Sequence, residues 1–92
     1  MPRPRHPGLI LREEFLDPAD AKPADLSRLT GLDITRLNSV IAGSARIEAD
    51  MAILFGRCLG TKPSFWLNLQ SAYDLDCAAR QLGSQVESVM PL

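Results

Sequence analysis

The residues best suited to do chemistry in this sequence are the polar side chains between Asp33 and Ala42. With Leu37 taken as the centre of an apolar side, helical geometry places Val40 and Ile41 within about 60° of it. The opposite side then carries small and mostly uncharged residues, namely Thr35, Asn38, Ser39 and Ala42. Such a face suits a helix that enters the major groove of DNA. A plain amphipathic surface helix is the alternative, and this segment alone does not decide between them.

Arg36 flanks that polar face, and a DNA-binding helix would use it to contact a phosphate or a guanine edge. The chain as a whole has no electrostatic attraction to nucleic acid. Ten Lys and Arg residues face eleven Asp and Glu residues, which gives a formal net charge of -1. Any DNA binding must therefore depend on a local patch.

Catalysis is the least favoured class of function. The sole histidine, His6, lies at an N-terminus that we expect to fray, and no Cys/His pair or phosphate-cradling glycine loop is present. Adjacent residues such as Glu13 and Glu14 point about 100° apart on a helix and do not converge. Cys58 and Cys77 lack metal-like spacing and are expected to be buried free thiols. We expect no enzyme activity, no metal and no cofactor.

The composition indicates one globular domain. The chain has 92 residues, of which 46% are hydrophobic and 23% are charged. No apolar run approaches the roughly 20 residues of a membrane helix. The basic N-terminus lacks the apolar stretch and cleavage site of a secretory signal. We therefore expect a cytoplasmic protein without a membrane partner.

Helix start and stop signals divide the chain into five predicted helices and no strands, which makes the fold class all-α. Prolines suit early helical positions, and glycines or an X-Pro step end the segments. Lys22 is a poor N-cap, so the signal for the start of the second predicted helix is weak. The second and third helices, joined across Gly31-Leu32, form a helix-turn-helix pattern. The predicted helices cover residues 7–16, 23–30, 34–42, 49–59 and 63 to 80 or 82.

Large side chains crowd the last predicted helix. Phe65, Trp66, Leu69, Ala72 and Tyr73 fall mostly on one helical stripe. A stripe of this size needs a core or a second subunit to cover it, so we interpret Phe65, Trp66, Leu69 and Tyr73 as core or dimer-interface residues. Residues 1–82 form the predicted domain. Residues 83–92 have no sustained pattern and are expected to be a mobile tail.

Three blocks of the sequence together resemble a known family. The blocks are HPGLILREEFL, the helix-turn-helix from Ala24 to Gly43, and ADMAILFGRCLGTKPSFWLNLQSAYDL. They resemble the HigA-type antitoxins of the lambda-repressor-like helix-turn-helix superfamily, over residues 6 to about 76. The resemblance implies a five-helix homodimer, joined through the C-terminal helix, that binds the operator of its own operon. It also implies a partner toxin, typically a small basic ribonuclease that cuts ribosome-bound messenger RNA.

The resemblance also implies which residues contact DNA. The family's reading residues fall on the start of the third helix, on the following loop and on the entrance to the second helix. Here these positions are Lys22, Pro23, Ile34, Thr35, Arg36, Asn38, Ser39, Ala42, Ser44, Ala45 and Arg46.

Several of these positions depart from the family pattern in a direction that weakens DNA binding. Pro23 stands where a polar residue is common, and it lacks a backbone donor. Ile34 replaces Arg or Gln, Ala42 replaces Asn, and Ser44-Ala45 replaces a Lys/Arg-rich loop. A good bidentate base contact is worth ~1–3 kcal/mol, so two or three losses would move a nanomolar operator toward micromolar affinity. Ile34 either packs inward or contacts thymine methyl groups.

The leading hypothesis is therefore a dimeric antitoxin and autorepressor. Acidic surface would complement a basic toxin, through residues 13, 14 and 17 or through residues 74, 76 and 87. One alternative is an antitoxin-like interaction module that has lost most operator recognition. Another is a solitary regulator with no toxin.

Overall fold

The first helix begins at His6, whose side chain caps it. The computed structural model describes residues 3–92. In it, His6 Nδ1 accepts a hydrogen bond of 2.9 Å from the Gly8 N–H, and Pro7 occupies the first turn of α1 (Pro7–Ile10). The histidine is half-buried, and its ring packs edge-on against Tyr73 with centroids 4.9 Å apart. The expectation that His6 frays was wrong, because this cap and this aromatic contact hold it in place.

The helix continues from α1 into η1 (Leu11–Leu16), whose turns are wider than those of an α-helix. The Asp17 N–H bonds to the Arg12 carbonyl at 2.8 Å, five residues back. This spacing brings Leu11 and Leu16 to the same side, and both are buried. The predicted helix over residues 7–16 is thus continuous, but its second half is π-helical.

Proline in the first turn and glycine after the last turn mark most bounds of the remaining helices. Gly31 and Gly60 adopt left-handed conformations, with φ of 77° and 73°, and end two of the helices. The later helices are α2 (Pro23–Thr30), α3 (Ile34–Ile41), α4 (Ala49–Leu59) and α5 (Pro63–Leu82), followed by the 3₁₀ segment η2 (Gly83–Ser88). Residues 3–92 contain no strand, so the all-α prediction is confirmed. Residues 83–88 form this 3₁₀ turn with every residue exposed, and the mobility expected for residues 83–92 stays a prediction.

Helices α1 and α3 pack so closely that the backbone of α1 at Gly8 lies against the backbone of α3 at Val40. A Cβ added to Gly8 would lie 1.8 Å from the Val40 carbonyl oxygen. No side chain fits at position 8 unless the two helices separate. Glycine at this position therefore sets the distance between α1 and α3.

The core is built around Trp66, which is fully buried. Its ring centroid lies 5.2 Å from that of Phe15, 5.3 Å from that of Phe55 and 5.0 Å from that of Phe65. The indole N–H donates to Thr61 Oγ1 at 2.7 Å. The other buried apolar residues are Leu11, Leu16, Leu26, Leu32, Leu37, Val40, Ile47, Met51, Ala52 and Phe55. Cys58 and Cys77 are free thiols that are half-buried rather than fully buried.

A buried amide joins the loop before α4 to α5. Gln70 is 2% exposed. Its Oε1 accepts the Ile47 N–H at 2.7 Å, and its Nε2 donates to Asp74 Oδ1 at 2.9 Å. Because a buried N–H without a partner is costly, Gln70 fixes where the loop lies on α5.

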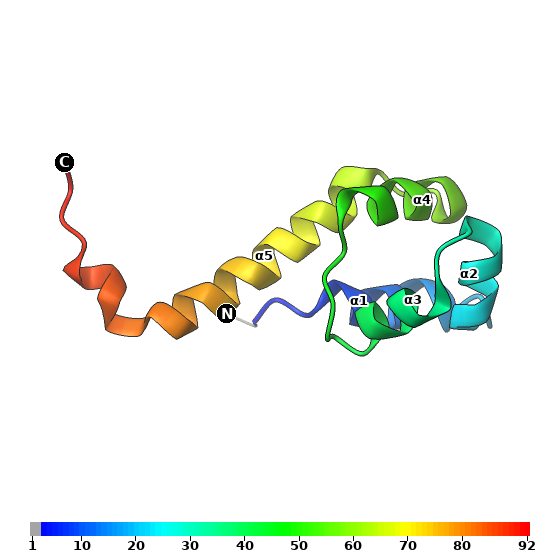
Figure 1. Ribbon diagram of the computed structural model, residues 1–92, viewed down its shortest axis with the longest axis horizontal. Coiled ribbons are helices and arrows are strands. Elements are labelled where there is room, and N and C mark those ends of the chain that lie inside the picture. The colour runs from blue at the N-terminus through cyan, green and yellow to red at the C-terminus, as the bar shows by residue number, and fades with distance from the viewer. Residues whose placement is uncertain (1–2) are drawn as a thin grey trace.

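The second half of α5 extends away from the other helices, as Figure 1 shows. The molecule measures 49 × 23 × 22 Å along its principal axes. Leu75 and Val89 on this extension are 71% and 73% exposed, and Leu82 and Val86 are also exposed. Within residues 3–92, no helix combines the length and apolar character needed to cross a membrane.

We expect Trp66→Ala to lower the free energy of unfolding by about 3–5 kcal/mol, because it removes the largest buried side chain and leaves a cavity. Phe65→Ala is the matched control, since Phe65 is 39% exposed and should cost much less. Urea denaturation followed by circular dichroism measures both. Equal losses for the two variants would contradict the central place given to Trp66.

Candidate nucleic-acid interface

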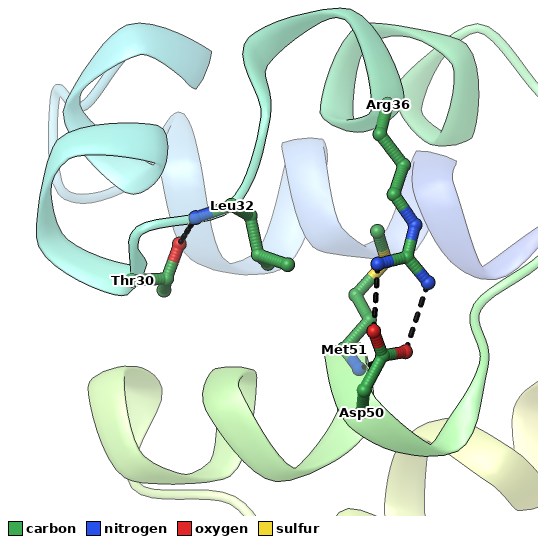
Figure 2. Close-up of polar contacts among 5 residues, drawn as sticks. All are labelled: Thr30, Leu32, Arg36, Asp50 and Met51. Atoms are coloured by element: carbon green, nitrogen blue, oxygen red, sulfur yellow. Dashed lines mark hydrogen bonds and ion pairs between the residues drawn. The ribbon is translucent and has the colours of Figure 1, made fainter.

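The turn between α2 and α3 is fixed by hydroxyl groups. Thr30 Oγ1 donates to the Leu26 carbonyl at 2.6 Å and accepts the Leu32 N–H at 3.2 Å, the latter drawn in Figure 2. Ser27 Oγ donates to the Leu32 carbonyl at 2.5 Å. Leu32 itself is buried. The angle between the two helices is therefore held by both polar and apolar contacts.

The start of α3 is capped by Asp33, whose Oδ2 accepts the Arg36 N–H at 3.1 Å. Leu37 and Val40 are fully buried. Thr35, Asn38 and Ala42 are exposed, as the helical angles predicted. Ile34 lies at the margin with 37% exposure, so its side chain is neither fully packed inward nor fully free.

Ser39 and the loop after α3 fold against the end of that helix. Ser39 is half-buried, and its Oγ donates to the Thr35 carbonyl at 3.0 Å. Ser44 Oγ donates to the Ser39 carbonyl at 3.1 Å, and the Ser44 and Ala45 N–H groups point to the same oxygen at 2.9 and 3.2 Å. These bonds hold Ser44 beside α3 and continue its exposed surface into the loop.

Arg36 is engaged by a carboxylate instead of being free. Its two terminal nitrogens donate to the two oxygens of Asp50, each at 2.8 Å; Figure 2 shows this fork between α3 and the first turn of α4. The hydrogen bonds from Arg36 and from the Met51 N–H lower the pKa of the Asp50 carboxyl to about 2. The same pair raises the pKa of Arg36. Sequence analysis placed Arg36 at the flank of the polar face without a partner. Asp50 was missed because nothing local to either residue indicates a pair fourteen positions apart.

Arg46 is likewise paired, with Asp74 of α5 at 2.8 Å. A shallow cleft between the loop and α5 is lined by Arg36, Arg46, Tyr73 and Asp74, and by His6. Burial lowers the pKa of the His6 imidazole, although a hydrogen bond to the Ala45 backbone and the Asp74 charge oppose this effect. His6 is therefore mostly neutral at pH 7.

Lys22 is exposed at the entrance to α2. Its backbone N–H donates to Asp25 Oδ2 at 2.8 Å, so Asp25 supplies the cap that the Lys22 side chain does not. That N–H is thus already bonded, while the Lys22 side chain lies at the surface.

The four residues predicted as core or dimer interface differ in their surroundings. Trp66 is buried, Phe65 packs against Phe15 and Trp66, and Leu69 and Tyr73 are half-buried within the same chain. Within residues 3–92, no group of three or more His, Cys, Asp and Glu side chains is arranged to hold a metal ion.

No family model matches the chain, but individual relatives do. Antitoxin HigA-1 of Vibrio cholerae is 32% identical over 90 residues, which span 98% of this chain and 85% of that protein. The structure of the antitoxin GraA is 42% identical, covers 100% of both chains and gives a TM-score of 0.93. The structure of the Pseudomonas aeruginosa antitoxin HigA with the higBA promoter is 44% identical, covers 98% of this chain and 99% of that one, and also gives 0.93. With its helix-turn-helix, its all-α fold and these full-length matches, the chain belongs to the HigA family of antitoxins.

Proposed function

We propose that the protein is a non-catalytic antitoxin of the cytoplasm that also represses its own operon as a DNA-bound dimer. The observation that carries this is the exposed face of α3. Thr35, Asn38 and Ala42 are small, uncharged and exposed on a helix whose other side is buried. A relative that matches nearly the whole chain was crystallised with promoter DNA. The same use of α3 here would place it in the major groove.

The residues proposed to contact DNA are those implied by the family resemblance. Thr35 and Asn38 would read base edges, and Ile34 at the margin would contact thymine methyl groups. Ser39 and Ser44 would contact the DNA backbone beside α3, since their hydroxyl groups lie in the surface formed by α3 and the loop. Lys22 would approach a phosphate directly, whereas Arg36 and Arg46 would do so only on leaving Asp50 and Asp74.

For the toxin we propose a surface on η1 and the turn after it. A small basic ribonuclease would be attracted by carboxylates that are not already neutralised. Glu14 and Asp17 are exposed and form no ion pair within residues 3–92. Asp74 and Asp76, by contrast, pair with Arg46 and Arg80. Charge therefore favours the η1 surface over α5.

The alternative function is an interaction module that binds a toxin but recognises its operator poorly. Both arginines near α3 are engaged by carboxylates, and Ala42 and Ala45 offer no polar group. A solitary regulator without a toxin is a further alternative, which the neighbouring gene product would decide.

Titration of the protein against a duplex from its own promoter tests the repressor function. We expect specific binding whose affinity falls as salt rises from about 50 to about 200 mM. Co-purification with the neighbouring gene product tests the antitoxin function in parallel. Toxin binding without any promoter binding at the lower salt would favour the interaction module.

Asn38→Ala should weaken operator binding by about 5- to 150-fold, the cost of losing a bidentate contact to a base. Binding to a scrambled duplex should not change, because Asn38 carries no charge. Asn68→Ala is the matched control, since Asn68 is exposed on α5. It lies away from the surface formed by residues 34–46 of α3 and the following loop (the α3 surface). Fluorescence anisotropy with both duplexes measures these effects. Equal operator affinities for the two variants would show that Asn38 does not contact a base of the operator.

Dimerisation is proposed to use the outer half of α5 and η2. The side chains available for a second copy are Leu75, Leu82, Val86 and Val89, since Trp66 is occupied within the chain. Leu75 and Leu82, seven residues apart, lie along one apolar stripe of α5. Beyond Gly83, Val86 and Val89 line a shallow hollow together with Leu82. Two copies joined in this way would present their α3 helices to half-sites about 34 Å apart.

Leu82→Glu should convert the dimer to a monomer, because it places a charge within the apolar stripe. Leu29→Glu is the control, since Leu29 is 62% exposed on α2, outside that stripe. Multi-angle light scattering after size exclusion gives the mass. A dimeric Leu82→Glu protein would show that the subunits associate elsewhere.

A further inference from the structure

Each arginine in the segment that forms the α3 surface is held by a carboxylate from another helix. Arg36 is paired with Asp50 of α4, and Arg46 with Asp74 of α5. Residues 34–46 contain no other Lys or Arg. The positive charge of this surface is therefore balanced within the protein before any DNA arrives.

We propose that Asp50 withholds Arg36 from DNA phosphates and thereby determines how well the protein distinguishes its operator from other DNA. The inference rests on the proposed operator binding. Affinity for arbitrary DNA grows with each phosphate that a cation neutralises. With Arg36 occupied, that contribution is small, and discrimination depends on the neutral side chains Thr35 and Asn38.

The geometry makes Asp50 and a phosphate competitors for the same atoms. Asp50 accepts one hydrogen bond from each terminal nitrogen of Arg36, at 2.8 Å in both cases. A phosphate presents a similar pair of oxygens to this fork. Arg36 therefore has to leave Asp50 before it can bind a phosphate in this bidentate manner.

Asp50 has stabilising contacts besides Arg36. Asp50 lies in the first turn of α4, where the helix dipole favours a negative charge, and its Oδ1 also accepts the Met51 N–H at 2.8 Å. Asp50 therefore keeps stabilising contacts when Arg36 leaves. The charge of Glu48 also acts on Arg36, so an experiment on Asp50 must account for this second carboxylate.

Asp50→Asn is the central test, with an operator duplex and a scrambled duplex of the same length titrated at about 50 and about 200 mM salt. We expect tighter binding to the scrambled duplex and a smaller ratio of operator to scrambled affinity. One added phosphate contact should steepen the slope of log K against log salt by about 0.9, an additional loss of about 3.5-fold across this salt range. Glu48→Gln combined with Asp50→Asn should enhance the effect, because no nearby carboxylate replaces Asp50.

Two further variants isolate the role of Arg36. Adding Arg36→Gln to Asp50→Asn should return the salt slope to that of the wild type. Glu87→Gln makes the same change in net charge on η2, where Glu87 is exposed and has no ion pair within residues 3–92, and should leave the slope unchanged.

The outcomes separate the alternatives. An unchanged slope and ratio in Asp50→Asn, alone and combined with Glu48→Gln, would overturn the proposal and leave the pair as a brace between α3 and α4. Weaker operator binding with unchanged scrambled binding would also overturn it, since Asp50 would then be positioning Arg36 for a base contact. A wild-type protein that does not distinguish the two duplexes would instead contradict the proposed function.

A titration of the free protein by NMR tests the pair without DNA. The Asp50 carboxyl carbon should still report an ionised group at about pH 3 in the wild type, and Arg36→Gln should raise its pKa toward the ordinary value. An ordinary pKa for Asp50 in the wild type would show that the pair does not form in solution, and the proposal would fail.

Discussion

The structure depends on keeping the indole of Trp66 out of water while its N–H retains a partner. Thr61, in the corner between α4 and α5, provides that partner. Phe15 from η1 and Phe55 from α4 pack against the ring. One side chain of α5 therefore fixes the relative positions of three parts of the chain, and it fixes the direction in which the rest of α5 leaves the body.

A second set of constraints is polar and belongs to the α3 surface. Thr30 closes the turn, Asp33 caps α3, and Gln70 holds the loop before α4. Ion pairs then tie that surface to α4 and α5. The side chains proposed to read DNA therefore project from a helix whose start, preceding turn and following loop are each held by hydrogen bonds.

Local signals made most helix bounds predictable from the sequence. Proline at a first turn and glycine in a left-handed conformation act on adjacent residues, so Pro23, Gly31 and Gly60 marked the bounds. The widened turns of η1 were missed because apolar patterning and helix start and stop signals indicate a helix without distinguishing π-helical from α-helical turns. The cap formed by His6 was missed because histidine is not among the residues that usually cap helices.

The candidate site was predictable only in part. Helical angles gave the exposed positions of Thr35, Asn38 and Ala42, because they depend on α3 alone. The partners of Arg36 and Ile47 lie fourteen and twenty-three residues away, and only the packing of α4 and α5 brings them close. Whether the residues implied by the family resemblance contact DNA remains a prediction.

The contact between Gly8 and the Val40 carbonyl has a consequence for how operator preference changes in such a protein. Because the backbones of α1 and α3 meet there, the position of α3 against α1 does not depend on side-chain shape at that point. The outward residues of α3 can then be exchanged for others without repacking beneath them. The same pair of helices can therefore carry different outward residues on α3, which under the proposed function is where a change in DNA preference would arise.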